Sequence, residues 1–147
     1  MRFVKQWILL PLLLAAAAAY AADQAAVAAP VDTRYDLQLS PAEQAEFLAE
    51  MRNMLASIQQ IMIGIGTSDR ALIAEYARRS GNKMARATPA AVRAKLPPSF
   101  QALGEPTHMG FEELAIRAES DDMDMLARDT GKLMNQCMAC HAAFKVR

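Results

Sequence analysis

The chain has 147 residues, with 16 basic and 16 acidic side chains that give a formal net charge of zero. No basic patch with interleaved aromatic residues is present, and this excludes a typical nucleic-acid-binding protein. The length suits a single domain with one modest core.

Residues 1–22 are typical of a secretory signal peptide. Arg2 and Lys5 precede an apolar run over residues 7–19, and small residues surround the expected cleavage site near Ala21 or Ala22. The run is shorter than the roughly 20 apolar residues of a membrane span, although an uncleaved anchor stays open as the alternative. Loss of the two leader cations leaves 14 basic and 16 acidic residues, a net charge of −2, and no second candidate membrane segment. We therefore expect a protein exported to the bacterial periplasm.

Residues 23–39 are rich in Ala, Val and Pro without sustained periodicity, and we expect a mobile lead-in there, followed by one domain over residues 40–147. Ser40, Pro41 and Glu43 predict a helix start, with a capping serine, a proline in the first turn and a glutamate three residues after the cap. Apolar residues at alternating steps of three and four then predict further helices. The expected helices run from Ser40 to about Gly64 or Gly66, from Asp69 to about Met84, from Thr107 to about Ser120 and from Asp122 to Phe144, with a short helical turn around Ala90 to Lys95.

The predicted class is all-α, because no segment alternates like a strand over a useful length. Four helices with mostly short connections favour an antiparallel four-helix bundle, with one longer crossover between the second and third helices. Prolines and a glycine preclude one long helix in that crossover. These residues are Pro89, Pro97, Pro98, Gly104 and Pro106.

The two cysteines of the chain, Cys137 and Cys140, lie on the last predicted helix and are followed directly by His141. Residues at i, i+3 and i+4 of a helix lie on one face, so the three side chains emerge together within about a turn. Two thioethers at this spacing can tether a porphyrin by its two vinyl groups, while the imidazole reaches the iron. The C-x-x-C-H string is the attachment signature of c-type haem. We therefore expect one covalently bound haem c near the C-terminal end of the last helix, with iron bound by His141.

Three alternatives compete with haem at this motif. A zinc site needs two more ligands, and His108 is the only other histidine or cysteine in the chain. A thioredoxin-like dithiol would lie at a helix N-terminus after a strand, whereas this pair lies near a helix C-terminus. A disulfide between positions i and i+3 of a helix closes a small loop and contributes little stability.

The C-terminal segment QCMACHAAFKVR, at the end of a four-helix pattern, resembles the class II c-type cytochromes, the family of cytochrome c′ and its low-spin, methionine-ligated relatives. The resemblance covers the chain from about Leu39 onward and includes Phe144, Lys145 and a GFEEL-like third helix. It implies that the first helix supplies the group on the far side of the iron. Family members often carry an arginine near a haem propionate one turn before that group. Here Phe47 holds that place, and Arg52 or Lys145 are the candidate cations.

Topology limits the candidates for the sixth iron ligand. In an up-down-up-down bundle, the end of the fourth helix lies beside the start of the first, the end of the second and the start of the third. The side chains expected there are Phe47, Leu48, Met51, Met54, Met84, His108, Met109 and Phe111. Alignment by the Ser-Pro cap with the family pattern points to Met51, with Met54 as the main rival. We expect His108 to be a surface residue at a helix start.

The expected function is electron transfer by a periplasmic monohaem cytochrome that is not an enzyme, with Cys137 and Cys140 holding the haem and His141 and Met51 binding iron. The alternative is a five-coordinate protein, similar to cytochrome c′, in which Met51 only fills the pocket and nitric oxide or carbon monoxide binds the iron. Electron transfer implies redox partner proteins. The sequence identifies neither these partners nor the reduction potential of the haem. Association of two copies through the first and second helices stays open.

Overall fold

The computed structural model describes residues 31–147 and is mostly helical, which confirms the all-α class. Contacts divide the chain after Thr33, and the elements below belong to the unit from Arg34 to Arg147. The predicted leader, residues 1–22, lies outside the described residues, as does the lead-in up to residue 30. The elements are β1 (Tyr35–Asp36), α2 (Pro41–Thr67), α3 (Arg70–Ser80), α4 (Asn82–Ala87), α5 (Ala90–Arg93), α6 (Pro98–Arg117), α7 (Met123–Ala143) and β2 (Phe144–Lys145).

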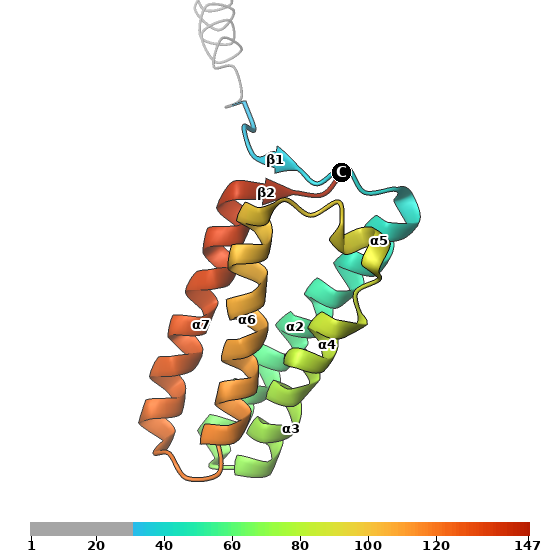
Figure 1. The fold of residues 1–147 in the computed structure, drawn as a ribbon. Helices are drawn as coiled ribbons and strands as arrows, with labels where there is room; N and C mark the ends of the chain where they lie inside the picture. The colour runs from blue at the N-terminus through green and yellow to red at the C-terminus, as the bar shows by residue number, and fades with distance from the viewer. Residues whose placement is uncertain (1–30) are drawn as a thin grey trace, which may run out of the picture. The chain divides into compact units, whose positions relative to one another are not determined.

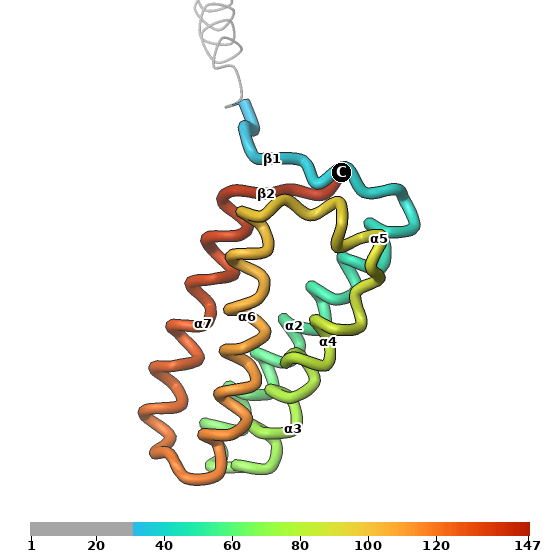
Figure 2. The backbone as a smooth tube through the Cα atoms, in the orientation of Figure 1, coloured from blue at the N-terminus to red at the C-terminus, as the bar shows by residue number. Residues whose placement is uncertain are grey.

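The longer helices α2, α3, α6 and α7 lie side by side (Figures 1 and 2). Each of them packs on the next one along the chain, and α7 also contacts α2. The short helices α4 and α5 belong to the connection between α3 and α6, and α4 packs on both of those helices. This connection therefore follows the side of the helices instead of closing as a tight turn.

The start of α2 agrees with its sequence signal. Ser40 is the N-cap and Pro41 is the first helical residue. The backbone N–H of Glu43 donates to Ser40 Oγ at 3.4 Å, and the N–H of Ser40 donates to Glu43 Oε2 at 2.7 Å. This reciprocal capping box satisfies two of the N–H groups that a helix start leaves without partners. The helix ends before Ser68, which adopts a left-handed conformation with φ of 57°.

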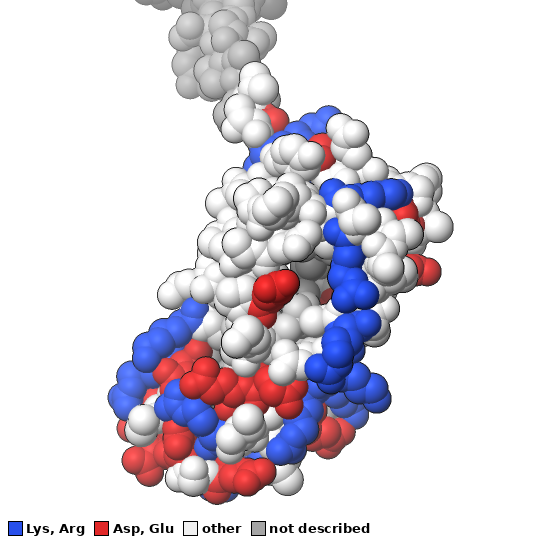
Figure 3. Space-filling view, in the orientation of Figure 1, with Lys and Arg blue, Asp and Glu red and all other residues white. Residues whose placement is uncertain are grey.

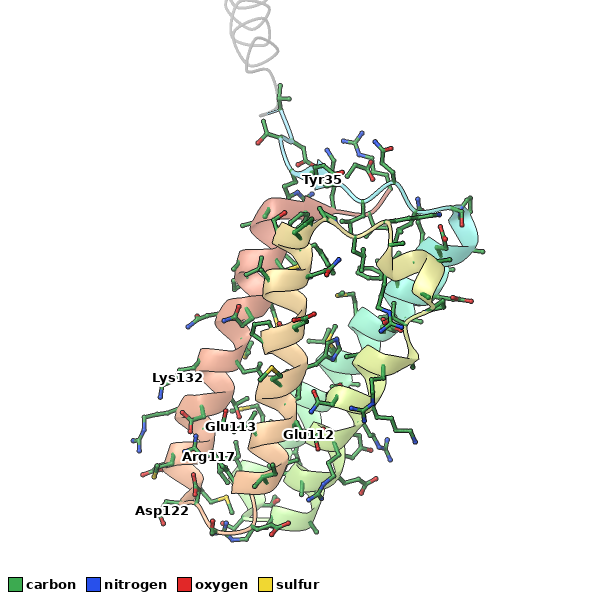
Figure 4. The ribbon with its side chains drawn as sticks, in the orientation of Figure 1. Tyr35, Glu112, Glu113, Arg117, Asp122 and Lys132 are labelled. Carbon is green, nitrogen blue, oxygen red and sulfur yellow. The ribbon has the colours of Figure 1, made fainter. Side chains whose placement is uncertain are left out.

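The second predicted helix is divided at Gly81. It ends as α3 at Ser80, and Asn82 begins α4. The N–H of Asn82 donates to Glu112 Oε2 of α6 at 3.1 Å, so a side chain from a neighbouring helix caps α4 (Figure 4). A Cβ atom at position 81 would collide with that same carboxylate oxygen, so a larger residue there would displace the carboxylate from the N–H of Asn82.

The third helix begins earlier than predicted, so its predicted start at Thr107 is wrong. The N-cap is Pro97 and the first helical residue is Pro98, where a missing N–H costs nothing. Pro106 lies inside α6, although an interior proline costs about 3 kcal/mol. Burial of the apolar face of α6 opposes that cost. The hydroxyl of Thr107 donates to the carbonyl of Leu103 at 2.7 Å, within the helix.

The first turns of α7 are joined to the end of α6 by charge. Arg117 of α6, which is labelled in Figure 4, lies 2.6 Å from Asp121 and 2.6 Å from Asp129 of α7. These pairs hold the turn that reverses the chain between the two helices. The helix itself runs from Met123 to Ala143, as its apolar repeat predicts.

The described end of the predicted lead-in packs against the helices. Tyr35 and Asp36 form a short parallel pairing with Phe144 and Lys145 after α7. Leu37 and Leu39 are buried, although this segment has no helical periodicity that would have predicted it. The rings of Tyr35 and Phe144 meet edge to face, with centroids 6.1 Å apart.

Two separate groups of buried side chains form the interior. The first lies between the long helices and includes Ile61, Ile73, Phe111 and Leu126, all fully buried. The second lies near the chain ends. Its members are Leu37, Leu39, Phe47, Val92, Leu96, Phe100 and Phe144. Within residues 31–147, no helix is both long and apolar enough to cross a bilayer.

Candidate functional site

The cysteines and the histidine of the sequence motif lie on the last two turns of α7, which remains helical to Ala143. Cys137 and Cys140 are half-buried, and His141 is exposed. All three line one cavity of about 590 Å³. Cofactor and small-molecule sites have volumes of about 300–1,000 Å³. One helix therefore presents two sulfurs and an imidazole to a space large enough for an organic cofactor.

The wall of this cavity is largely apolar and joins the two buried groups. Ile58 belongs to the first group, and Phe47, Leu96 and Phe100 belong to the second. The rings of Phe47 and Phe100 are 5.7 Å apart between centroids. The cavity thus lies between the two cores, where an apolar ligand would complete the packing.

Two methionines of α2 line the cavity together with His141. Met51 is half-buried and packs against the core near the chain ends, whereas Met54, one turn further along, packs against the core between the long helices. Both thioethers are thus in the space that the α7 motif lines. The structure brings together the predicted residues Cys137, Cys140, His141 and Met51.

Three of the other expected neighbours do not line the cavity. Met109 is 62% exposed, and Phe111 is fully buried in the core between the long helices. Met84 lies on α4 and is also outside the lining. No residue of the predicted second helix, Asp69 to Met84, lines the cavity, whereas Ala85 and Arg86, just beyond its predicted end, do.

His108 lies in the middle of α6 and is half-buried, so its assignment as a surface residue at a helix start is wrong. Its Nδ1 atom is 2.7 Å from the carbonyl oxygen of Ser80. A carbonyl only accepts hydrogen bonds, so Nδ1 carries a proton in this contact. The Ser80 hydroxyl in turn donates to Ser57 Oγ at 2.8 Å in the interior. The ring of His108 is thereby fixed in the cavity wall.

Charged side chains also border the cavity. Arg52 was a candidate from the sequence, but Arg86 on α4 and Arg93 on α5 were not. The segment that contains Arg86 and Arg93 has no clear apolar repeat. Only their positive charge could have marked them as site residues in the sequence. Lys145, the other candidate cation, lies in β2 and outside the cavity lining. Figure 3 shows positive side chains following one edge of a hollow in this face of the molecule.

Burial affects the titration of several cavity residues. It raises the pKa of the Cys137 and Cys140 thiols, and the neighbouring Cys137 adds to the rise at Cys140. Both groups are therefore neutral thiols at neutral pH. Burial also raises the pKa of the Glu50 carboxyl, while the nearby His108 opposes that rise.

These observations disfavour two of the alternatives. A reactive dithiol has a lowered thiol pKa in a positive, exposed setting, and Cys137 and Cys140 have the opposite shift. In the part of the chain that the structure describes, no three His, Cys, Asp or Glu side chains are grouped to hold a metal ion, as zinc would require. Both cysteines are free in this structure.

Comparison of the chain with protein-family models, with curated proteins and with solved structures found no match. The functional argument therefore depends on the residues and the cavity.

Proposed function

We propose that this protein is a monohaem c-type cytochrome that transfers electrons, with the fold of an antiparallel four-helix bundle. One observation carries the proposal. Cys137, Cys140 and His141 from α7 and Met51 from α2 line one largely apolar cavity of about 590 Å³. A covalent attachment motif and a thioether at one cavity are the donor set of a cytochrome with histidine and methionine ligands.

The arrangement of the long helices supports the bundle. Helix α2 contacts α3, α3 contacts α6, and α6 contacts α7. Helix α7 in turn contacts α2. Helices connected in this way enclose a central space, and cofactor sites of bundles are built there from side chains of facing helices. In this proposal, α4 and α5 form the longer crossover.

The donor chemistry fits haem c. Each neutral thiol can add its S–H bond across one vinyl C=C bond, with the sulfur and the hydrogen going to the two carbons, so attachment needs no oxidant. His141 would supply an imidazole ligand to the iron and Met51 a thioether ligand. The bound haem supplies an iron that alternates between ferrous and ferric states. Methionine ligation favours the ferrous state and raises the potential.

In this proposal, residues of the chain shield the haem from water and keep the iron ligated, as an electron carrier requires. The apolar wall that includes Phe47 and Phe100 excludes water from the cofactor. Two ligands that stay bound in both iron states keep the structural change during electron transfer small. No substrate is transformed, so the protein is proposed as a carrier that works with redox partner proteins, and not as an enzyme. Its location in the periplasm depends on the leader, residues 1–22, and N-terminal sequencing of the mature protein tests it.

The first experiment is the production of the full chain together with a c-type cytochrome maturation system. We expect a Soret absorption that survives denaturation and acid extraction, because the thioether bonds are covalent. Alkylation should label neither Cys137 nor Cys140. Colourless protein with two alkylatable thiols would refute the proposal.

Replacement of the proposed distal ligand, Met51→Ala, tests the electron-transfer function. We expect the ferric protein to change from low-spin to high-spin iron, with loss of the methionine-to-iron charge-transfer band and a lower reduction potential. Met54→Ala is the matched control and should keep the low-spin spectrum.

Two outcomes would contradict Met51 as the ligand. A low-spin spectrum lost in Met54→Ala instead would transfer the role to Met54. A wild-type ferric protein that is already high-spin and binds nitric oxide or carbon monoxide at the iron would favour the gas-binding alternative.

A further inference from the structure

Three arginines line the cavity from three different elements. Arg52 belongs to α2, Arg86 to α4 and Arg93 to α5, and all three are exposed at its edge. Within residues 31–147, none of them has an ion pair or hydrogen bond from its side chain. Two carboxyls, Glu50 and Glu105, also line the cavity, so the cations are in excess there.

Some arginines of the described chain away from the cavity have carboxylate partners. Arg78 pairs with Glu119 at 3.3 Å, and Arg117 lies 2.6 Å from Asp129. The three arginines at the cavity, in contrast, line a largely apolar space and form no ion pair among the described residues. A guanidinium presents a planar fork of donors that matches a carboxylate.

The cysteines and two of these arginines come from opposite sides of α6. Figure 1 shows α7 on one side of α6 and α4 and α5 on the other. The porphyrin of haem has its vinyl groups on one edge and two propionate carboxylates on the opposite edge. Attachment through Cys137 and Cys140 on α7 would direct the propionates away from α7, toward the side that α4 and α5 cover.

We propose that Arg86 and Arg93 bind the two propionate carboxylates of the haem, an inference that rests on the proposed function. Carboxylates at the edge of an apolar cavity lose part of their hydration, and charge-assisted hydrogen bonds from guanidinium groups offset that loss. The two guanidinium groups provide them from the crossover segment. The crossover thus has a role in cofactor binding beyond the connection of α3 to α6.

The test uses the holoprotein with ¹³C-labelled propionate carboxylates and compares Arg86→Gln, Arg93→Gln and the double variant. We expect the carboxylate bands in redox difference infrared spectra to shift in each single variant and further in the double variant. The reduction potential should fall, because removal of a positive charge near the iron favours the ferric state. Arg86→Lys should retain most of the potential but still shift the band, because lysine keeps the charge and loses the fork.

Lys83→Gln is the matched control, because Lys83 is also a cation on α4 but lies outside the cavity lining. It should leave the carboxylate bands unchanged. Unchanged bands in the arginine variants of a protein that does carry haem would overturn this inference alone. A change only in the salt dependence of electron transfer to an acidic partner would also overturn it, in favour of a docking role. Absence of the Soret band from the wild type would instead refute the proposed function.

Discussion

Glu43 combines two tasks at the start of α2. Its carboxylate accepts the N–H of Ser40 at 2.7 Å, and it also lies 2.7 Å from Nζ of Lys95, which follows α5. The interaction with Lys95 first, and then those with Ser40, lowers the pKa of Glu43 from 4.5 to about 2. One side chain thereby links a helix cap to the crossover that carries Arg93.

The shifted pKa of Glu43 predicts a pH-dependent contribution to stability. A carboxyl with a lowered pKa in the folded state stabilises the fold above its unfolded pKa and loses that contribution as the pH falls through the folded pKa. The contribution should therefore be complete above about pH 5 and decline from there toward pH 2. We expect Glu43→Gln to unfold more easily than the wild type at pH 6, with a smaller difference at pH 2.5, in urea titrations followed by circular dichroism.

Glu46→Gln on the next turn of α2 is the control for Glu43→Gln, because Glu46 has neither a capping bond nor an ion pair among residues 31–147. It should change the unfolding free energy little and equally at both pH values. A difference between wild type and Glu43→Gln that does not depend on pH would contradict the assignment of the shift to Glu43.

Residue types at the site were easier to predict from the sequence than residue environments. The spacing of Cys137, Cys140 and His141 determines a common helical face, so their shared cavity could be expected. Met51 followed from topology and a family pattern. The setting of His108 could not be expected, because its partner, the Ser80 carbonyl, is 28 residues away in the chain.

At the scale of elements, two glycines in helix interiors have opposite surroundings. A Cβ atom at Gly131 of α7 would meet no atom within 4 Å. A Cβ atom at Gly110 of α6 would lie 2.8 Å from Cδ1 of Leu133 on α7. Leu133 is buried, so its side chain has little freedom to move. Gly110 therefore permits the close approach of α6 and α7, whereas Gly131 has no such role.

These surroundings predict opposite effects of alanine. Gly131→Ala should raise the unfolding free energy by about 0.5–1 kcal/mol, because alanine loses less conformational entropy in a helix and nothing obstructs it. Gly110→Ala should lower the unfolding free energy by about 1–3 kcal/mol, because it overpacks the α6–α7 contact. Denaturant unfolding of the holoprotein measures both, and each variant serves as the control for the other. Destabilisation by Gly131→Ala would contradict the open surroundings of that residue.

Helix boundaries were predictable where the signal is local. The capping box of α2 depends on residues three positions apart, so Ser40 could be identified from the sequence. The start of α6 depends on whether packing can offset the cost of Pro106, which no local pattern reveals. The division of α3 from α4 likewise depends on Glu112 of α6, a long-range partner.

At the scale of the whole molecule, the cavity lies between two hydrophobic cores that form separate groups of buried side chains. One core lies between the long helices, and the other joins the start of α2, the crossover and the residues after α7. The cavity of about 590 Å³ is largely apolar, so without a ligand its apolar wall would face water, at a cost of roughly 25 cal/mol for each Å² left exposed. The two cores should therefore depend on a bound group between them.

We accordingly expect the variant with both Cys137→Ala and Cys140→Ala, produced without haem, to lose fixed tertiary structure near the cavity. Near-ultraviolet circular dichroism should weaken, and a hydrophobic dye should bind, while much of the far-ultraviolet helical signal remains. Hydrogen exchange should be faster in the segment that contains α4 and α5 than in the core around Phe111, because that segment borders the cavity. Met138→Ala, at a 70% exposed position between the two cysteines, is the matched control and should keep haem and rigid packing. A double variant as stable and as rigid as the holoprotein would mean that the two cores are sufficient by themselves, and the cavity would then lose its role as the place of a structural cofactor.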